Sequence, residues 1–534
     1  MCEVFFMRDK QPNFILYVTD QQRFDFLSNS GHPKLKTPNI DKLAENGVAF
    51  DRFYVANPTC MPNRASLMTC QMPSNHGVRF NGVPLDKNFV TFVDVLRSAG
   101  YDTALIGKSH LQTVTGSKPE FEPKKETPGY QPLPEAIANA KKSRLADSEY
   151  QIEGPEFWIK PNAKVPTPYY GFDHVDLVTR HGTNTGANHE IWLRNKDPDL
   201  LKKRLKENQL YHDYICPQAI RTALPEELYS SSYIAQKACE WLKDREGSDR
   251  PFFLMVSWPD PHHPFTPPGK YWDLYSPTEM ETPASFSSDS WVPPTYVEIA
   301  QKERKADKEL GQKGGKTIAV TKKEALEARA LTCGMIALID DCVGVIQETV
   351  ENKFKSSEIV QIFTSDHGDH LGDHGLLFKG VEQYDTLTHV PFIWSDPKSP
   401  KNIRSKELAQ TIDIGVSILS RAKVSAPYGF QGQPLSVVGG KERKNILIEY
   451  DSQRPSKFFG NQPRARTLIT DQFRLTYYHP IEYFELFNLI EDPNELENLA
   501  DLPEYGGVKT ELIAQLLALE VKSRSNLPLP THSA

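Results

Sequence analysis

The chain has 534 residues, of which 62 are Lys or Arg and 69 are Asp or Glu, so its formal net charge is −7. Hydrophobic residues make up 39% and charged residues 25%, as in soluble globular enzymes, and the mildly acidic balance argues against a nucleic-acid binder. No window approaches the roughly 18 apolar residues of a membrane span, and the N-terminus shows no secretory signal. Seven scattered cysteines suit a reducing compartment. We therefore expect a cytoplasmic protein whose partners include neither nucleic acid nor membrane.

Strands and helices are predicted to alternate along most of the chain. A continuous apolar run over 13–20 predicts a strand that is buried on both faces. Thr37 and Pro38 begin a helix that Gly47 ends, 48–54 reads as a second strand, and Pro62 begins a second helix. Further helices are predicted over 91–98, 231–245 and 323–352, and further strands over 102–106, 252–258 and 359–365. This alternation predicts an α/β fold with a large, mostly parallel sheet.

Three stretches rich in Pro or Lys interrupt the alternation, at residues 117–170, 259–294 and 301–325. We interpret them as insertions over one face of the sheet that could form a lid, because long connections are commonly functional or disordered. Passive surface decoration is an equal alternative for 301–325.

The pattern changes after about residue 430. Short strands over 445–450, 466–470 and 473–478 are followed by a helix near 508–521, which indicates a small antiparallel unit. The sequence thus predicts a catalytic α/β domain over residues 1–430, with insertions near 117–170 and 259–325. A small C-terminal α+β subdomain is predicted over 431–534.

Polar residues follow several of the predicted strands, where ligands bind in open α/β sheets. Asp20 and Gln21 end the first strand, and Asp366 and His367 follow the strand over 359–365. Oxygen ligands with one imidazole suit Ca²⁺, Mn²⁺ or Mg²⁺ better than structural zinc. Taken alone, Asp20 is better interpreted as an ordinary turn residue than as a metal ligand. The dense Asp and His run over 366–375 favours a metal site.

Residues 60–66, CMPNRAS, follow a strand and begin a helix. A helix N-terminus favours negative charge and lowers the pKa of a thiol, so Cys60 is placed as a nucleophile with Arg64 one turn further. An inert packed thiol is the commoner role of an isolated cysteine. Here, however, the specific pattern C-x-P-x-R is complete.

With this pattern the chain resembles the sulfatase family of the alkaline-phosphatase-like superfamily, in which that cysteine is oxidised to formylglycine. The resemblance covers nearly the whole chain, and six motifs occur in the family's order. They are VTDQ at 18–21, CMPNR at 60–64, GKSH at 107–110, PHHPF at 261–265, TSDHG at 364–368 followed by Lys379, and ELFNLIEDPNE at 485–495. The resemblance implies the alkaline-phosphatase-like fold, in which helices sandwich the large sheet.

The resemblance also implies a role for each matching residue. One divalent ion, Ca²⁺ first with Mn²⁺ or Mg²⁺ as alternatives, would be held by Asp20, Gln21, Asp366, His367 and formylglycine at position 60. The catalytic residues would be Cys60, Arg64, Asn81, Lys108, His110, His262 and Lys379. The implied partners are a small-molecule ester and a formylglycine-generating enzyme, and homo-oligomerisation is left open.

These residue types suit sulfuryl transfer. The metal, Arg64, Lys108 and Lys379 could neutralise one sulfuryl group, while Asp366 takes a proton from the hydrated aldehyde. His262 or Lys379 would assist the leaving oxygen, and His110 would drive the expulsion of sulfate. His263 is the less favoured neighbour of His262, and His370 and His374 are expected to be structural.

The residues at five positions bear on substrate class. Gln21, His367 and Asn81 resemble the choline sulfatase and phosphonate monoester hydrolase branch. Lys108 and His110 match the general sulfatase pair, where phosphonate monoester hydrolases tend to have Tyr and Thr. We therefore expect hydrolysis of aryl or small organic sulfate monoesters, with phosphonate monoester or phosphodiester hydrolysis as the alternative. A two-metal phosphatase and a non-enzymatic binding module with an unmodified Cys60 are remoter alternatives.

Overall fold

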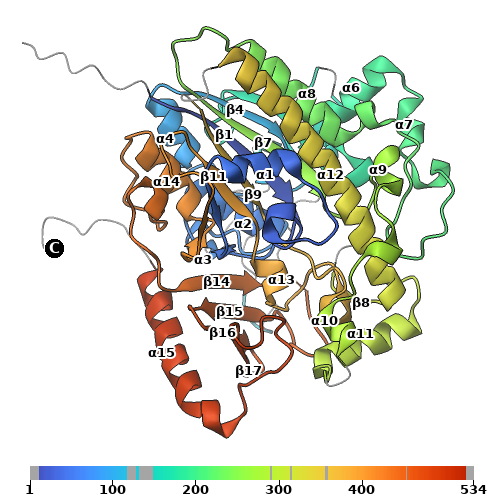
Figure 1. The fold of residues 1–534 in the computed structure, drawn as a ribbon, viewed down its shortest axis with the longest axis vertical. Coiled ribbons are helices and arrows are strands. Elements are labelled where there is room, and N and C mark those ends of the chain that lie inside the picture. The colour runs from blue at the N-terminus through green and yellow to red at the C-terminus, as the bar shows by residue number, and fades with distance from the viewer. Residues whose placement is uncertain are drawn as a thin grey trace, which may run out of the picture.

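The computed structural model describes residues 11–116, 128–131, 148–160, 162–288, 291–312, 316–354, 359–452 and 454–524. Much of the predicted insertion at 117–170 lies outside these residues. A nine-stranded sheet forms the centre of the molecule, in the order β12-β2-β11-β9-β1-β7-β4-β5-β6 (Figure 1). In that order its strands are Ile403–Ser405, Val48–Phe50, Phe392–Ser395, Ile359–Ser365, Asn13–Asp20, Phe252–Pro261, Asp102–Gly107, His174–Thr179 and Gly186–Ala187.

The middle of this sheet is parallel. β9, β1, β7, β4 and β5 run in one direction, whereas β11 is antiparallel to both of its neighbours and β6 is antiparallel to β5. All eight residues of β1 are buried, as expected for a central strand covered on both faces. The predicted α/β fold with a mostly parallel sheet is confirmed.

Helices cover both faces of the sheet. Because side chains alternate along a strand, Ile15 and Tyr17 of β1 join the core under one set of helices, and Phe14 and Leu16 join the other. The first core includes α1 (Pro38–Glu45), α8 (Ser230–Lys243) and α12 (Lys322–Lys353), and the second includes α2 (Cys60–Thr69), α4 (Phe92–Ser98) and α14 (Asp413–Arg421). The helices predicted near the positions of α1, α2, α4, α8 and α12 are confirmed, whereas α14 was not predicted.

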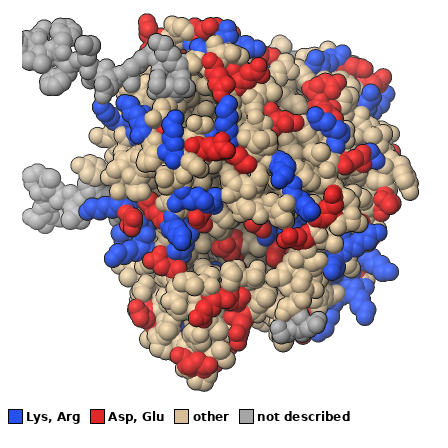
Figure 2. All heavy atoms as spheres, viewed as in Figure 1, with Lys and Arg blue, Asp and Glu red and all other residues tan. Residues whose placement is uncertain are grey.

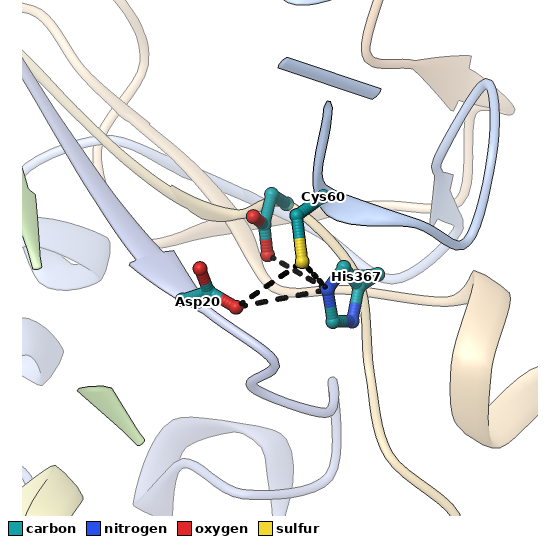
Figure 3. Close-up of side chains that lie close together, drawn as sticks. Asp20, Cys60 and His367 are labelled. Carbon is teal, nitrogen blue, oxygen red and sulfur yellow. Dashed lines mark hydrogen bonds and ion pairs between the residues drawn. The ribbon is translucent and has the colours of Figure 1, made fainter. Parts of the chain in front are cut away.

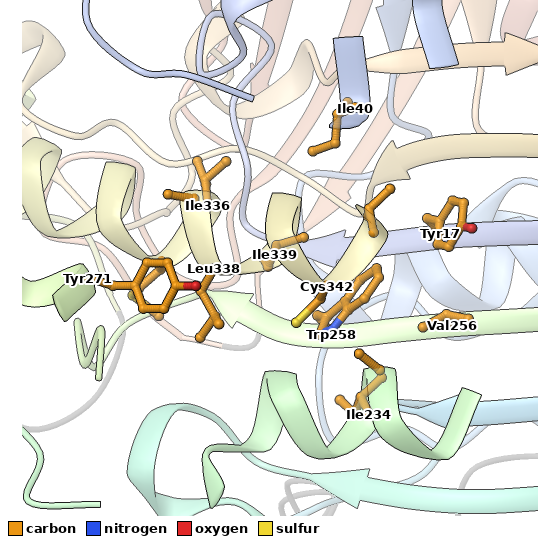
Figure 4. Packing of buried hydrophobic residues seen from close by; sticks show 14 of the residues in the cluster. Tyr17, Ile40, Ile234, Val256, Trp258, Tyr271, Ile336, Leu338, Ile339 and Cys342 are labelled. Carbon is orange, nitrogen blue, oxygen red and sulfur yellow. The ribbon is translucent and has the colours of Figure 1, made fainter. Parts of the chain in front are cut away.

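Helix α12 contains an 18-residue window that is long and apolar enough to span a membrane. The expectation that no window approaches this composition was therefore wrong. The window is apolar because it packs in the core. Of its residues, 83% are buried inside the fold, where Ile339 and Cys342 lie near Tyr17 and Trp258 (Figure 4). Such burial on all sides is typical of a core helix.

Two predicted boundaries near the front of the chain were wrong. The strand expected over 48–54 is divided into β2, in the large sheet, and β3 (Phe53–Tyr54), which pairs with β13 (Ala409–Gln410). Asp51 and Arg52 lie between the two strands and form partly exposed ion pairs with Arg404 and Asp471. The strand is interrupted where these two charged side chains turn toward the surface. Helix α2 begins at Cys60 rather than at Pro62, since the first turn of a helix has no N–H bonds for a proline to break.

The C-terminal strands form a separate antiparallel sheet in the order β14-β15-β16-β17, with α15 (Gly506–Lys522) packed against it at the outside of the molecule (Figure 1). Its strands are Ile446–Asp451, Arg464–Ile469, Phe473–His479 and Tyr483–Asn488. Three of them were predicted; the sequence analysis did not identify β17, which carries the start of the closing motif. The domain boundary at residue 430 stays a prediction.

The stretch over 259–325 is largely folded. It holds α9 (Lys270–Asp273), α10 (Ala284–Ser287), α11 (Thr295–Ala306) and β8 (Ile318–Ala319). β8 pairs with β10 (Leu376–Leu377), and the Lys316 backbone bridges to Lys379, so this segment lies beside a predicted site residue. The proposed lid role of this segment stays a prediction.

Basic and acidic groups are interspersed on the face of the molecule drawn in Figure 2.

Short helices complete the described chain. They are α3 (Pro73–His76), α5 (Pro155–Trp158), α6 (Asn188–Lys196), α7 (Leu200–Lys203) and α13 (Asp385–Thr388).

Candidate active site

The carboxyl ends of β1 and β9 meet the first turn of α2 in a buried cluster (Figure 3). β1 and β9 are adjacent and parallel, so Asp20 and the pair Asp366 and His367 arrive at the same edge of the sheet. Cys60, the first residue of α2, faces them. None of these four residues is more than 2% exposed.

The four side chains bring one ligand atom each within 4.8 Å of the others. The Cys60 Sγ lies 3.1 Å from the His367 Nε2 and 3.8 Å from the Asp20 Oδ1. The same Nε2 lies 3.6 Å from the Asp20 Oδ1 and 3.5 Å from the Asp366 Oδ1. Predicted residues from three distant segments are therefore gathered at one point.

Arg64 connects the two carboxylates from one helical turn further along α2. Its Nε donates to the Asp366 Oδ2 at 2.7 Å, and its Nη2 lies 3.4 Å from the Asp20 Oδ2. Its Nη1 donates to the Lys108 carbonyl at 3.1 Å and to the Ser257 Oγ at 2.9 Å. The guanidinium is thus held by four groups, and it positions both carboxylates as well as adding charge.

Lys379 lies on the other side of Cys60. Its Nζ is 3.2 Å from the Cys60 Sγ, 3.0 Å from the Nε2 atoms of His262 and His367, and 2.7 Å from the Gln21 Oε1. Four predicted residues therefore converge on this one ammonium group.

Gln21 is held in place by its neighbours. Its backbone adopts a left-handed conformation, with φ 69°, and its N–H donates to the Asp366 Oδ1 at 3.1 Å. Its Nε2 donates to Asp369 and lies 2.9 Å from the His263 Nδ1. His263, the less favoured of the histidine pair, thus contacts the amide group of Gln21, whose Oε1 faces Lys379.

His181 belongs to the site, although the sequence analysis did not select it. Its Nε2 lies 2.6 Å from the Lys108 Nζ, which also donates to Asp20, and its ring stacks on His262 with 3.7 Å between ring centres. Asp20, His181 and His262 form a second group that could hold a metal ion. The signal was available: 177–179 is a short apolar run followed by a polar residue, as at the other strand ends.

Two predicted residues lie at the margin. The Asn81 Oδ1 accepts the Met61 N–H at 3.1 Å, so this amide binds the first turn of α2. The His110 backbone N–H donates to Glu153 at 2.8 Å, and its ring is buried with no partner for Nδ1 among the described residues. The His110 and His181 ring centres are 6.4 Å apart.

His370 and His374 lie outside the cluster. The His374 ring stacks on Tyr384 with 3.6 Å between ring centres, and its Nε2 lies 3.1 Å from the Glu495 carbonyl. His370 lies 3.7 Å from Glu382. These contacts agree with the structural role expected of both histidines.

The charges shift the pKa values of the central groups. Burial and Asp20 raise the pKa of the Cys60 thiol, but Lys379, His367 and Lys108 lower it further, so it lies below its ordinary value. Burial and the neighbouring cations lower the pKa values of His110 and His262 well below the usual range. The imidazoles of these two residues are therefore neutral bases near pH 7, and the thiol ionises readily.

The donor set fits a divalent cation. The His367 Nδ1 lies 2.8 Å from the Gly368 carbonyl, which makes Nδ1 a protonated nitrogen and turns Nε2 toward the cluster. Burial and Lys379 lower the pKa of His367, but Asp366 and Cys60 raise it above its ordinary value, so a metal ion would displace a proton from Nε2. The other donors are carboxylate oxygens of Asp20 and Asp366 and the Cys60 sulfur. The Gln21 Oε1 lies nearby, 2.7 Å from the Lys379 Nζ. Replacing that sulfur by oxygen would complete a set that hard cations prefer.

Comparisons with known proteins agree with the resemblance. The family model described as Sulfatase matches residues 12–424, and the model for the C-terminal region of N-sulphoglucosamine sulphohydrolase matches residues 372–522. An arylsulfatase of Clostridium perfringens is 25% identical over 96% of this chain and 95% of its own. The multifunctional alkaline phosphatase superfamily protein PehA of Trinickia caryophylli is 26% identical over 95% of both.

Solved structures share the fold. The phosphonate monoester hydrolase of Agrobacterium radiobacter superposes with a TM-score of 0.73 at 25% identity, covering 96% of each chain. A protein crystallised with its substrate D-glucosamine-2-N,6-O-disulfate has a TM-score of 0.67 at 19% identity, covering 96% of this chain and 98% of that one. The alkaline-phosphatase-like fold expected from the motifs is thus confirmed.

Proposed function

The chain belongs to the sulfatase family of sulfuric ester hydrolases, and we propose that it hydrolyses aryl or small organic sulfate monoesters through a nucleophile formed from Cys60. One observation carries the proposal. Cys60 begins α2 within 3.2 Å of both Lys379 and His367, in a cluster that also holds Arg64 and Lys108. A nucleophile among so many cations suits an anionic ester.

Two groups would complete this site. Asp20, Gln21, Asp366, His367 and residue 60 would hold a divalent ion, which supplies Lewis-acid polarisation of a sulfuryl oxygen when bound. Oxidation of Cys60 to formylglycine supplies, after hydration, a hydroxyl nucleophile with a second hydroxyl beside it. An unmodified cysteine lacks that second hydroxyl.

The chain's own residues neutralise charge and move protons. Lys108 and Lys379 approach from the Asp20 side and the Cys60 side, so together they can bind the oxygens of one sulfuryl group. The His262 Nε2 is 3.0 Å from the Lys379 Nζ, and this pair can pass a proton to the leaving oxygen. His110 is buried and neutral, and its Nδ1 can accept a proton when sulfate is released.

The nucleophile is tested with Cys60→Ala. We expect this variant to lose aryl sulfatase activity while keeping its thermal unfolding midpoint, and the mass of the wild-type peptide to show conversion of Cys60 to formylglycine. Cys70→Ala, which removes a buried thiol from the other end of the same helix, is the matched control and retains activity. Wild-type turnover in Cys60→Ala would contradict the mechanism.

Phosphonate monoester hydrolysis is the second candidate, favoured by the similarity to the Agrobacterium enzyme and by Gln21 and His367. Lys108 and His110 support sulfate as the preferred substrate. We expect kcat/KM for an aryl sulfate to exceed that for the matched aryl phosphonate. The double variant Lys108→Tyr, His110→Thr should shift this ratio toward the phosphonate. A wild type that strongly prefers the phosphonate would favour the second candidate.

We propose a cytoplasmic location for the protein. The six cysteines in the described part of the chain are buried and unpaired by disulfides, which suits a reducing compartment.

A further inference from the structure

The four donor atoms at Cys60 have the spacing of a tetrahedral metal site. Zinc binds sulfur at about 2.3 Å and nitrogen or oxygen at about 2.0–2.2 Å, so the edges of its ligand tetrahedron measure about 3.3–3.8 Å. The four edges already described around Cys60 and His367 measure 3.1, 3.5, 3.6 and 3.8 Å. Four of the six edges are thus close to the zinc range. The other two, from the Asp366 carboxylate to Asp20 and to Cys60, lie within 4.8 Å, so a modest movement of the side chains would complete the tetrahedron.

Three of the four ligands are also held from behind. Arg64 binds the Oδ2 of Asp366 and Lys108 binds the Oδ2 of Asp20, which leaves both Oδ1 atoms facing the centre. The Gly368 carbonyl orients the His367 ring in the same way. Such outer contacts fix ligand orientation in metal proteins. In the structure the Cys60 sulfur and the His367 Nε2 face a cation already, the ammonium of Lys379.

Sulfur decides which metal this arrangement prefers. Thiolate with imidazole is a donor set for zinc, whereas Ca²⁺ and Mg²⁺ take oxygen ligands almost entirely. We propose that the chain with Cys60 unmodified binds Zn²⁺ through the Asp20 Oδ1, the Cys60 Sγ, the Asp366 Oδ1 and the His367 Nε2, and prefers it to Ca²⁺. With oxygen at position 60 the preference moves toward hard cations. That second statement rests on the proposed function for the mature enzyme, but zinc binding by the unmodified chain does not.

Cobalt provides a direct test, because Co²⁺ substitutes for zinc and its absorption spectrum reports sulfur ligation. The chain is produced without a maturation enzyme, its Cys60 is confirmed by peptide mass, and metal is removed with a chelator. We expect one Co²⁺ per chain, with tetrahedral d–d bands and a thiolate-to-cobalt charge-transfer band. Zn²⁺ should abolish both signals, and Ca²⁺ should not.

The matched variants are Cys60→Ser and Cys70→Ser. Cys60→Ser should lose the charge-transfer band, bind zinc at least about 10–100-fold more weakly, and gain in affinity for Ca²⁺ relative to Zn²⁺. Cys70→Ser should keep the wild-type spectrum. Circular dichroism checks that both are folded. If Cys60→Ser does not fold, protection of wild-type Cys60 from iodoacetamide by Zn²⁺ is measured instead by peptide mass.

Several results would overturn the proposal: no charge-transfer band in the wild type, an unchanged band in Cys60→Ser, loss of the band in Cys70→Ser, displacement of cobalt by Ca²⁺, or no zinc protection of Cys60. Each of these leaves sulfatase activity of the matured chain untouched. Conversely, a chain that binds zinc but shows no esterase activity after maturation would overturn the proposed function alone.

Discussion

Single buried charges decide the chemistry of the site. Asp20 and Asp366 are no more than 2% exposed, and each is stabilised by a buried cation, Lys108 or Arg64. Burial raises the pKa of Asp20, but the charge of Lys108 and the neighbouring His262 and His181 lower it well below the usual range. Removing either carboxylate therefore removes a proposed metal ligand and also takes the nearest carboxylate away from a buried cation.

Comparing Asp366→Ala with a variant of another Asp–Arg pair separates the loss of a metal ligand from the loss of a counter-charge. For Asp366→Ala we expect loss of the bound divalent ion and of activity, together with about 3–5 kcal/mol of stability, because buried Arg64 loses its nearest carboxylate and keeps only the longer contact of 3.4 Å with Asp20. Asp396→Ala breaks another Asp–Arg pair elsewhere in the fold, between buried Asp396 and partly buried Arg421. It should lose stability but keep metal and activity. Stoichiometric metal in Asp366→Ala, measured by elemental analysis, would contradict the ligand assignment.

Lys108 and His110 are two residues apart but are expected to act at different steps. Lys108→Ala should lower kcat/KM for an aryl sulfate because charge neutralisation in the transition state is lost. His110→Ala should release a burst of alcohol and then turn over slowly, because proton removal is needed to free sulfate. Rapid-quench measurements of alcohol and sulfate distinguish the two. The same loss without a burst in both variants would refute separate roles.

At the scale of helices and strands, the ends of elements depend on distant partners. Helix α1 begins after Thr37, whose side chain makes no capping hydrogen bond. The cap comes instead from α12, where the Asp340 carboxylate accepts the Ile40 N–H at 2.8 Å and the Asn39 N–H at 3.1 Å. The contact fixes α12 against the start of α1 and satisfies N–H groups that would otherwise be unpaired.

This cap should make stability depend on pH. Burial raises the pKa of Asp340 to about 6, although the amides of Ile40 and Asn39 oppose the shift. The folded state holds this proton more tightly than the unfolded chain, so the contribution to stability is complete below about pH 4 and is lost as pH rises through about 6. The linked change is up to about 3 kcal/mol.

Urea unfolding at a series of pH values checks this. Asp340→Asn should remove that part of the pH dependence, whereas Asp341→Asn, at the exposed next position, should keep it. The same slope in wild type and Asp340→Asn would show that another group is responsible. Asp340→Ala should in addition cost about 1–3 kcal/mol, because buried N–H groups lose their acceptor.

At the scale of the whole molecule, the C-terminal sheet packs against the segment that follows β9. Tyr384 of that segment shares an apolar cluster with Tyr478 and Phe487 of the sheet. Arg474 of β16, fully buried, pairs with Glu495 and lies 3.7 Å from Glu485. The Glu495 Oε2 in turn accepts the Asp385 N–H at 2.7 Å. The sheet thus supports the segment that follows the proposed metal ligands Asp366 and His367.

Arg474→Met tests this support. It should destabilise the protein by about 3–5 kcal/mol, because two buried carboxylates lose their counter-charge. Arg464→Met removes a cation whose side chain is 49% exposed, 3.9 Å from Asp451, and should change stability by about 0–1 kcal/mol. Denaturant unfolding measures both. An effect of Arg474→Met as small as that of the control would contradict the role of the buried network.

The sequence by itself determined the fold class and most of the site. Continuous apolar strands such as 13–20 and amphipathic or buried helices such as 323–352 are local patterns, and local periodicity survives in the folded protein. Asp20, Asp366 and His367 were identifiable because the carboxyl ends of parallel strands must meet at one edge of the sheet. Cys60 and Arg64 stood out through a short motif on one helical turn.

Only the tertiary structure decided features that depend on partners far away in the chain. The division of 48–54 follows from two different neighbouring strands, and the cap of α1 comes from Asp340, about 300 residues away. The end of the strand before His181 was visible in the sequence, but its place beside the site was not, because it depends on the pairing of β5 with β4. The Oδ1 atoms of Asp20 and Asp366 both face the His367 Nε2, and this orientation likewise depends on Lys108 and Arg64 behind them. Such arrangements follow from packing and from the pairing of buried charges, which exist only once the chain is folded.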